Sequence, residues 1–124
     1  NNIKIIKTGV VSDEDLSELY AAAEMLVYPS FYEGFGLPPL EAMSCGCPVI
    51  AANCTSIPEI IGGAGLLINP QSEEELTHAI ETVIKNKVIK NKMIEKGLKQ
   101  AKKFSWKKCA KETIKYLSEI AGEK

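Results

Sequence analysis

Residues 28–49 of the chain read YPSFYEGFGLPPLEAMSCGCPV. Short apolar runs at residues 25–28 and 48–52 have the length and character of buried strands. Between them, Gly34 and Gly36 favour a tight turn, and the prolines that follow suit the first turn of a helix, where a missing amide hydrogen costs nothing. Gly46 ends that helix after about eight residues. A strand, a helix and a second strand form a βαβ unit, so the sequence predicts a parallel sheet with flanking helices.

Two carboxylates, Glu33 and Glu41, enclose this turn with seven residues between them. We expect Glu41 to lie in the first turn of the helix. A turn that leads into a helix N-terminus presents free backbone amides and the positive end of the helix dipole, which together bind phosphate. Ionised carboxylates accept hydrogen bonds from hydroxyl groups. A phosphate site flanked by hydroxyl acceptors predicts a nucleotide sugar as the ligand.

The remaining sequence predicts a strand at residues 3–8, a helix capped by Ser12 to about residue 23, and a strand at residues 65–68. Further helices are predicted over residues 72–86, 90–103 and 105–120, with Phe104 and Trp106 anchoring the last one in the core. Four polar residues lie near strand ends, where the sites of α/β proteins collect, although Ser and Thr at strand ends more often only form caps or turns; they are Ser30, Tyr32, Thr55 and Ser56.

The segment from Glu33 to Glu41 resembles the Glu-x7-Glu motif of retaining GT-B glycosyltransferases, especially those of glycosyltransferase family 4. The similarity extends to GVVSDEDL at residues 9–16, AMSCGCPV at 42–49, SIPE at 56–59 and FSW at 104–106, and so covers essentially the whole chain. It implies a Rossmann-like, α/β domain, namely the C-terminal, donor-binding domain of a GT-B fold.

The resemblance implies roles for eight residues. Glu33 would be the catalytic residue and would hold hydroxyls of the donor sugar, and Glu41 would clasp the ribose. Backbone groups of the other six would contact the sugar ring, the diphosphate and the base: Gly34, Phe35 and Gly36 the ring, Leu37 the diphosphate, Val10 and Val11 the base. No metal site and no cofactor are expected, since the nucleotide diphosphate sugar is the donor substrate.

By the same resemblance, the parent enzyme transfers a hexose from a nucleotide diphosphate sugar to an acceptor with retention of configuration. The chain starts at what corresponds to the third strand of that domain, so the front part and the N-terminal acceptor domain are expected to be missing. The isolated chain should therefore be inactive. Residues 3–8 would lack their neighbouring strands, which predicts rearranged packing or self-association through exposed sheet edges.

Composition sets further limits. The chain has 124 residues, 45% of them hydrophobic, which is enough for one domain with its own core. All basic residues are Lys: residues 1–84 hold two Lys and twelve acidic residues, whereas residues 85–124 hold thirteen Lys and four acidic residues. The motif region thus has no cation of its own, and donor affinity should be weak. The basic C-terminal third suggests peripheral contact with the inner face of an anionic membrane, or simply a solvated helix face.

The four cysteines are expected to be reduced thiols of a cytoplasmic protein, and no nucleic-acid partner is expected. Two other functions stay open. One is a GT-B nucleotide-sugar epimerase, which uses the same phosphate and hydroxyl recognition. The other is a non-catalytic α/β interaction domain in which Glu33 and Glu41 only stabilise the turn.

Overall fold

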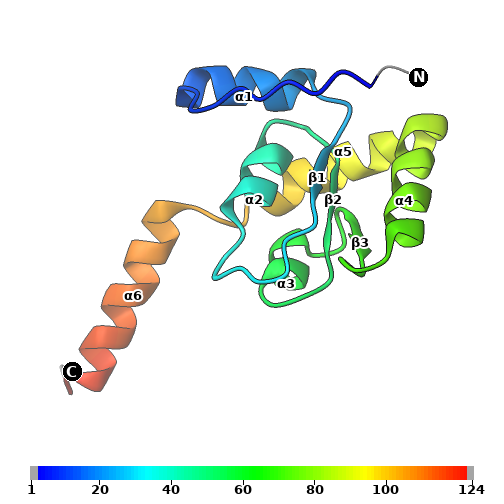
Figure 1. Cartoon of the computed structure of the whole chain (residues 1–124). Helices are drawn as coiled ribbons and strands as arrows, with labels where there is room; N and C mark the ends of the chain where they lie inside the picture. The colour runs from blue at the N-terminus through cyan, green and yellow to red at the C-terminus, as the bar shows by residue number, and fades with distance from the viewer. Residues whose placement is uncertain (1–2, 123–124) are drawn as a thin grey trace.

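The computed structural model of the protein describes residues 3–122. Three parallel strands form one sheet in the order β1-β2-β3, and helices cover both of its faces (Figure 1). In chain order the elements are α1 (Asp13–Ala22), β1 (Leu26–Tyr28), α2 (Leu37–Ser44), β2 (Val49–Ala52), α3 (Ile57–Ile61), β3 (Leu66–Ile68), α4 (Glu73–Lys85), α5 (Lys87–Ala101) and α6 (Trp106–Ile120).

The central strand β2 divides the core into two clusters. All four of its residues are buried, and successive side chains point to opposite faces of the sheet. Val49 and Ala51 join a cluster with residues of α2 and α3, whereas Ile50 joins a cluster with Ala79 of α4 and Met93 of α5. The apolar run that predicted a buried strand is therefore buried on both sides, as in parallel sheets generally.

The helix starts follow from local capping. The side chains of Ser12, Ser72, Asn86 and Ser105 each accept a hydrogen bond from the amide three residues later. Three of the helices therefore begin within a residue or so of the predicted positions. The exception is α5, which begins at Lys87 rather than at residue 90 because Asn86 caps it.

The strand predicted at residues 3–8 is wrong. Among the described residues, this segment pairs with no strand, and its isoleucines are exposed. Extended backbone becomes a strand only when a neighbouring strand satisfies its amide and carbonyl groups. Here the segment runs beside α1 instead of beside β1 (Figure 1). Rearranged packing or self-association at this end therefore stays a prediction.

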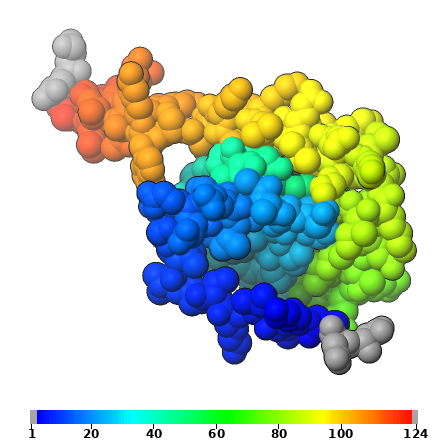
Figure 2. All heavy atoms as spheres, turned by 90° about the horizontal axis from the view of Figure 1, so that it is seen from above, coloured from blue at the N-terminus to red at the C-terminus, as the bar shows by residue number. Residues whose placement is uncertain are grey.

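The last helix also differs from expectation. Helix α6 has no buried residue, and Figures 1 and 2 show it projecting away from the rest of the chain. Trp106 is 80% exposed and does not anchor it. Phe104 does pack against the core, and its ring meets that of Phe35 edge to face at 6.0 Å. An apolar face of α6 is left uncovered; it includes Trp106, Ile114, Tyr116, Leu117 and Ile120.

Candidate functional site: the turn between β1 and α2

The turn that leads into α2 depends on Gly36. This residue is the N-cap of α2, with φ of +103°, and it is buried. A Cβ atom at this position would lie 2.9 Å from Cδ1 of the fully buried Ile57. Only glycine combines this backbone angle with this close approach. Gly34, by contrast, has open space on the side where a Cβ would point.

Unpaired backbone amides gather at this turn. Pro38 and Pro39 occupy the second and third positions of α2 and carry no amide hydrogen. Among the residues that the structure describes, no acceptor bonds the four amides just before them, those of residues 34–37. Free backbone amides at the positive end of a helix are the groups that generally favour an anion.

Glu33 stands at the entrance of the turn and is held by two hydroxyl groups. The phenol of Tyr28, the last residue of β1, donates to Oε1 of Glu33 at 2.5 Å. The hydroxyl of Ser30 donates to the same oxygen at 2.8 Å. These two bonds, that of Tyr28 foremost, lower the pKa of the Glu33 carboxyl below its usual value. Glu33 is therefore ionised at neutral pH and can act only as an acceptor.

The pKa of Tyr28 shifts in the opposite direction, upward. Burial, the hydrogen bond to Glu33 and the negative charge of Glu33 raise the pKa of Tyr28 to about 12. The phenol consequently keeps its proton throughout the physiological range and remains a donor to the carboxylate.

The loop between β2 and α3 holds the backbone of the turn. Oγ1 of Thr55 accepts from the amide of Glu33 at 3.2 Å, and the Ser56 hydroxyl contacts the carbonyl oxygens of Glu33 at 3.2 Å and Phe35 at 2.8 Å. Thr55 adopts a φ of +51°, the one positive φ of a non-glycine residue in the described part of the chain. A β-branched residue in this region is strained by about 1–3 kcal/mol, so the surrounding contacts impose its conformation.

Glu41 lies farther along α2 than predicted. The helix begins at Leu37, which makes Glu41 its fifth residue and places it in the second turn. Its side chain is exposed and faces Tyr20 of α1: burial and then the Glu41 carboxylate raise the pKa of Tyr20. The influence of the helix dipole fades beyond the first turn. Stabilisation of the helix end therefore explains the presence of a glutamate at position 41 less well than the sequence suggested.

Val10 and Val11 are the site candidates that the structure does not bring to the turn. Both precede α1, where Val10 is fully exposed and Val11 is half-buried. Figure 1 shows this segment beside α1, whereas the turn lies at the other end of α2.

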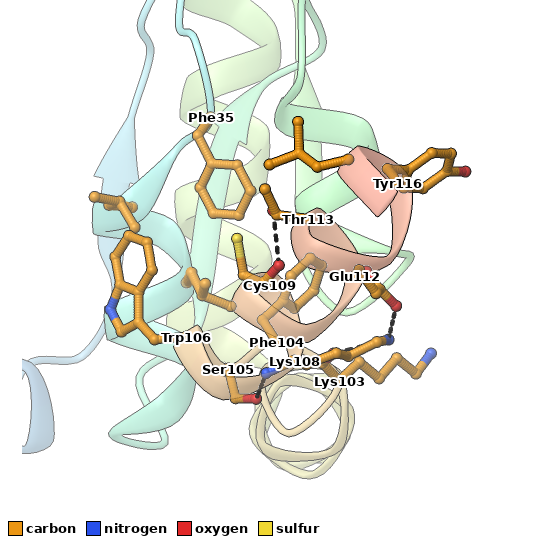
Figure 3. Close-up of a pocket in the computed structure, with 13 residues that line it drawn as sticks. Phe35, Lys103, Phe104, Ser105, Trp106, Lys108, Cys109, Glu112, Thr113 and Tyr116 are labelled. Carbon is orange, nitrogen blue, oxygen red and sulfur yellow. Dashed lines mark hydrogen bonds and ion pairs between the residues drawn. The ribbon is translucent and has the colours of Figure 1, made fainter. Parts of the chain in front are cut away.

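The side chains of Phe35 and Leu37 line a different feature, a groove of about 950 Å³ between the start of α2 and α6. Figure 3 shows Phe35, Trp106 and Tyr116 around it. Lys103 and Lys108 also line this groove. The fold thus brings lysines of the basic C-terminal third to the neighbourhood of a motif that has no cation in its own sequence.

Sequence reasoning missed Tyr28 and kept Ser30, Thr55 and Ser56 only as weaker candidates beside caps or turns. The available signal was their position, because hydroxyl residues that follow two adjacent parallel strands meet at one edge of the sheet. Within residues 3–122, no group of three potential metal ligands lies together, and no helix is long and apolar enough to cross a membrane.

The parallel sheet and the glycine-proline turn into α2 define a domain of the GT-B glycosyltransferase type. Residues 1–100 match the family described as glycosyl transferases group 1, and the chain belongs to that family. The solved structure of a sucrose-phosphate synthase from Thermosynechococcus elongatus superposes with a TM-score of 0.84 at 29% identity, over 94% of this chain and 30% of the other.

Curated relatives of this chain are also glycosyltransferases. The O-antigen chain mannosyltransferase B of Escherichia coli is 51% identical over 86% of this chain and 28% of its own length. A serotype-specific mannosyltransferase of Escherichia coli is 38% identical over 86% of this chain and 13% of its own length. The chain therefore spans less than a third of these relatives.

Proposed function

We propose that this chain is the donor-binding part of a retaining glycosyltransferase of family 4 that transfers a hexose from a nucleotide diphosphate sugar to an acceptor. The observation that carries the proposal is the set of four free amides at residues 34–37 beside the ionised carboxylate of Glu33. The amides suit a diphosphate, and the carboxylate suits sugar hydroxyls. The names of the two Escherichia coli relatives favour mannose as the hexose.

The chain's own residues supply binding and orientation. Amides aimed at the diphosphate stabilise the negative charge that grows on it as the glycosidic bond breaks. Glu33 fixes the sugar through its hydroxyls, and Glu41 holds the ribose. Ionised Glu33 cannot donate a proton at neutral pH, so its catalytic role is to position the donor.

The proposal is tested by NMR titration of isotope-labelled protein with GDP-, UDP- and ADP-linked hexoses. We expect amide shifts centred on residues 34–37 and Glu41 for one of the three nucleotides. No shift with any of them at millimolar concentration would contradict a donor site in this chain. The response also identifies the donor base, which the geometry of the turn does not specify.

Glu41→Ala provides the matched variant for this titration. If Glu41 holds the ribose diol, the variant should bind the nucleoside diphosphate about tenfold more weakly than wild type does. Its affinity for the 2′-deoxy analogue should equal that of wild type. Its stability should change by less than about 0.5 kcal/mol, as for other surface substitutions. Glu74→Ala, at an exposed position of α4, is the control. A loss of stability without a loss of affinity would favour the interaction-domain alternative instead.

We also propose that the complete enzyme covers the exposed apolar surfaces of residues 3–8 and α6, and that its acceptor domain lies outside this chain. The small share of each relative that the chain spans supports this. Alone, the chain should self-associate, so size-exclusion chromatography with light scattering should give a mass that rises with concentration. A monomer at every concentration would contradict it.

We further propose a cytoplasmic enzyme in peripheral contact with the anionic inner face of the membrane, a contact that the lysine-rich residues 85–124 support. Co-sedimentation with anionic vesicles that disappears on addition of salt would support this contact, and no binding at low salt would rule it out.

A further inference from the structure

The carboxylate of Glu33 has two unequal oxygens. Tyr28 and Ser30 both donate to Oε1, at 2.5 and 2.8 Å. Among residues 3–122, no donor bonds Oε2. A carboxylate accepts about four hydrogen bonds, two at each oxygen. The two hydroxyl donors fill Oε1, whereas Oε2 can still accept two hydrogen bonds. The carboxylate is thereby fixed in rotation and presents one oxygen to a ligand.

This arrangement is supported from two neighbouring strands. Tyr28 ends β1, and its ring packs against the buried cluster of α2, α3 and β2. Thr55 and Ser56 follow β2 and bond the backbone on both sides of the Glu33 side chain. The strained φ of Thr55 shows that this loop is held in place rather than relaxed. Two hydroxyl groups therefore hold the side chain of Glu33, and two more hold the backbone of the turn.

We propose that Tyr28 and Ser30 are positioning residues that hold Oε1 of Glu33, so that Oε2 accepts a hydrogen bond from a hydroxyl of the donor sugar. The inference rests on the proposed function, because it assigns the sugar to Glu33. It adds the orientation of the carboxylate and the two residues that set it. Removing either hydroxyl frees the carboxylate to rotate, which weakens sugar recognition without touching the diphosphate site.

The test compares two ligands, the nucleoside diphosphate hexose that binds best and the same nucleoside diphosphate without the sugar. Tyr28→Phe removes one hydroxyl and keeps the ring in the core, and Ser30→Ala removes the other. Each should weaken binding of the sugar nucleotide about three- to tenfold, and both together by more, while affinity for the nucleoside diphosphate stays at the wild-type value. Ser30→Thr, which keeps a hydroxyl, should bind the sugar nucleotide as wild type does.

Tyr32→Phe is the matched control, because Tyr32 lies in the same turn but is 80% exposed. A second readout needs no ligand. Carbon-13 NMR of the Glu33 carboxyl should show its pKa rising in Tyr28→Phe and rising further in the double variant, since hydrogen bonds to the charged form hold that pKa down. Tyr32→Phe should leave the pKa of Glu33 unchanged.

The outcomes separate the two claims. An unchanged pKa of Glu33 in Tyr28→Phe, or an equal loss of affinity for both ligands, would overturn the positioning role. Wild-type protein that binds no nucleotide sugar would overturn the donor site and, with it, the assignment of Oε2 to a sugar hydroxyl. A wild-type protein that binds, with variants that lose only the sugar-dependent part of affinity, supports both claims.

Discussion

Replacing Gly36 by alanine is expected to lower the free energy of unfolding by about 2–4 kcal/mol. Two effects add. A φ of +103° is strained for any residue that carries a Cβ, and the new methyl group would sit 2.9 Å from Cδ1 of Ile57. Although a side-chain methyl can often move aside, Ile57 is completely buried among α2, α3 and β2, so a shift of its methyl group also displaces neighbouring core side chains. Chemical denaturation of the purified variant measures the loss.

Gly34→Ala is the control for this measurement. It makes the same chemical change two residues earlier, where a Cβ meets no atom within 4 Å and the backbone is not left-handed. We expect its stability to be unchanged or to rise by about 0.4–1 kcal/mol, because alanine restricts the unfolded chain more than glycine does. If Gly34→Ala and Gly36→Ala were equally stable, the close packing of the turn on Ile57 would be disproved.

Local chemistry explains which parts of the fold could be predicted. The two prolines fix the backbone of the first turn, and the glycines permit backbone angles that other residues avoid, so the extent of α2 follows from the sequence to within a residue or two. The Ser12, Ser72 and Ser105 caps act within three residues and are equally readable. Glu41 was placed in the first turn of α2 only because the exact start of a helix is the least certain part of such a prediction.

What could not be predicted depends on partners distant in the sequence. Residues 3–8 have strand-like composition, but strand formation requires an adjacent edge, which the sequence of the segment does not reveal. Tryptophan is a residue type that is usually largely buried, and yet Trp106 lies on a helix that no other element in the described part of the chain covers. The bonds from Thr55 and Ser56 to the turn span more than twenty residues. They arise because β1 and β2 are parallel neighbours, so the segments after both strands reach the same edge.

Glu33→Gln is expected to weaken binding of the nucleotide sugar about 10- to 100-fold, the range for losing a hydrogen bond to a charged group. The substitution keeps the size of the side chain, and its effect follows from how the site is held. Tyr28 and Ser30 are both donors toward the position of Oε1, so the amide oxygen of glutamine must occupy that position. Its NH2 group is then directed to the position of Oε2, where a sugar hydroxyl would meet a donor instead of an acceptor.

Isothermal titration calorimetry measures the affinity of Glu33→Gln for the nucleotide sugar and for the nucleoside diphosphate. The affinity for the nucleoside diphosphate should equal that of wild type. Lowering the pH should mimic the substitution in the wild-type protein, because protonation removes the charge of Glu33. Since the pKa of Glu33 is below its usual value, sugar affinity should persist to a lower pH than for an ordinary glutamate, and Tyr28→Phe should move that loss to higher pH. Full sugar affinity in Glu33→Gln would show that the hydroxyls of the donor are held by other groups.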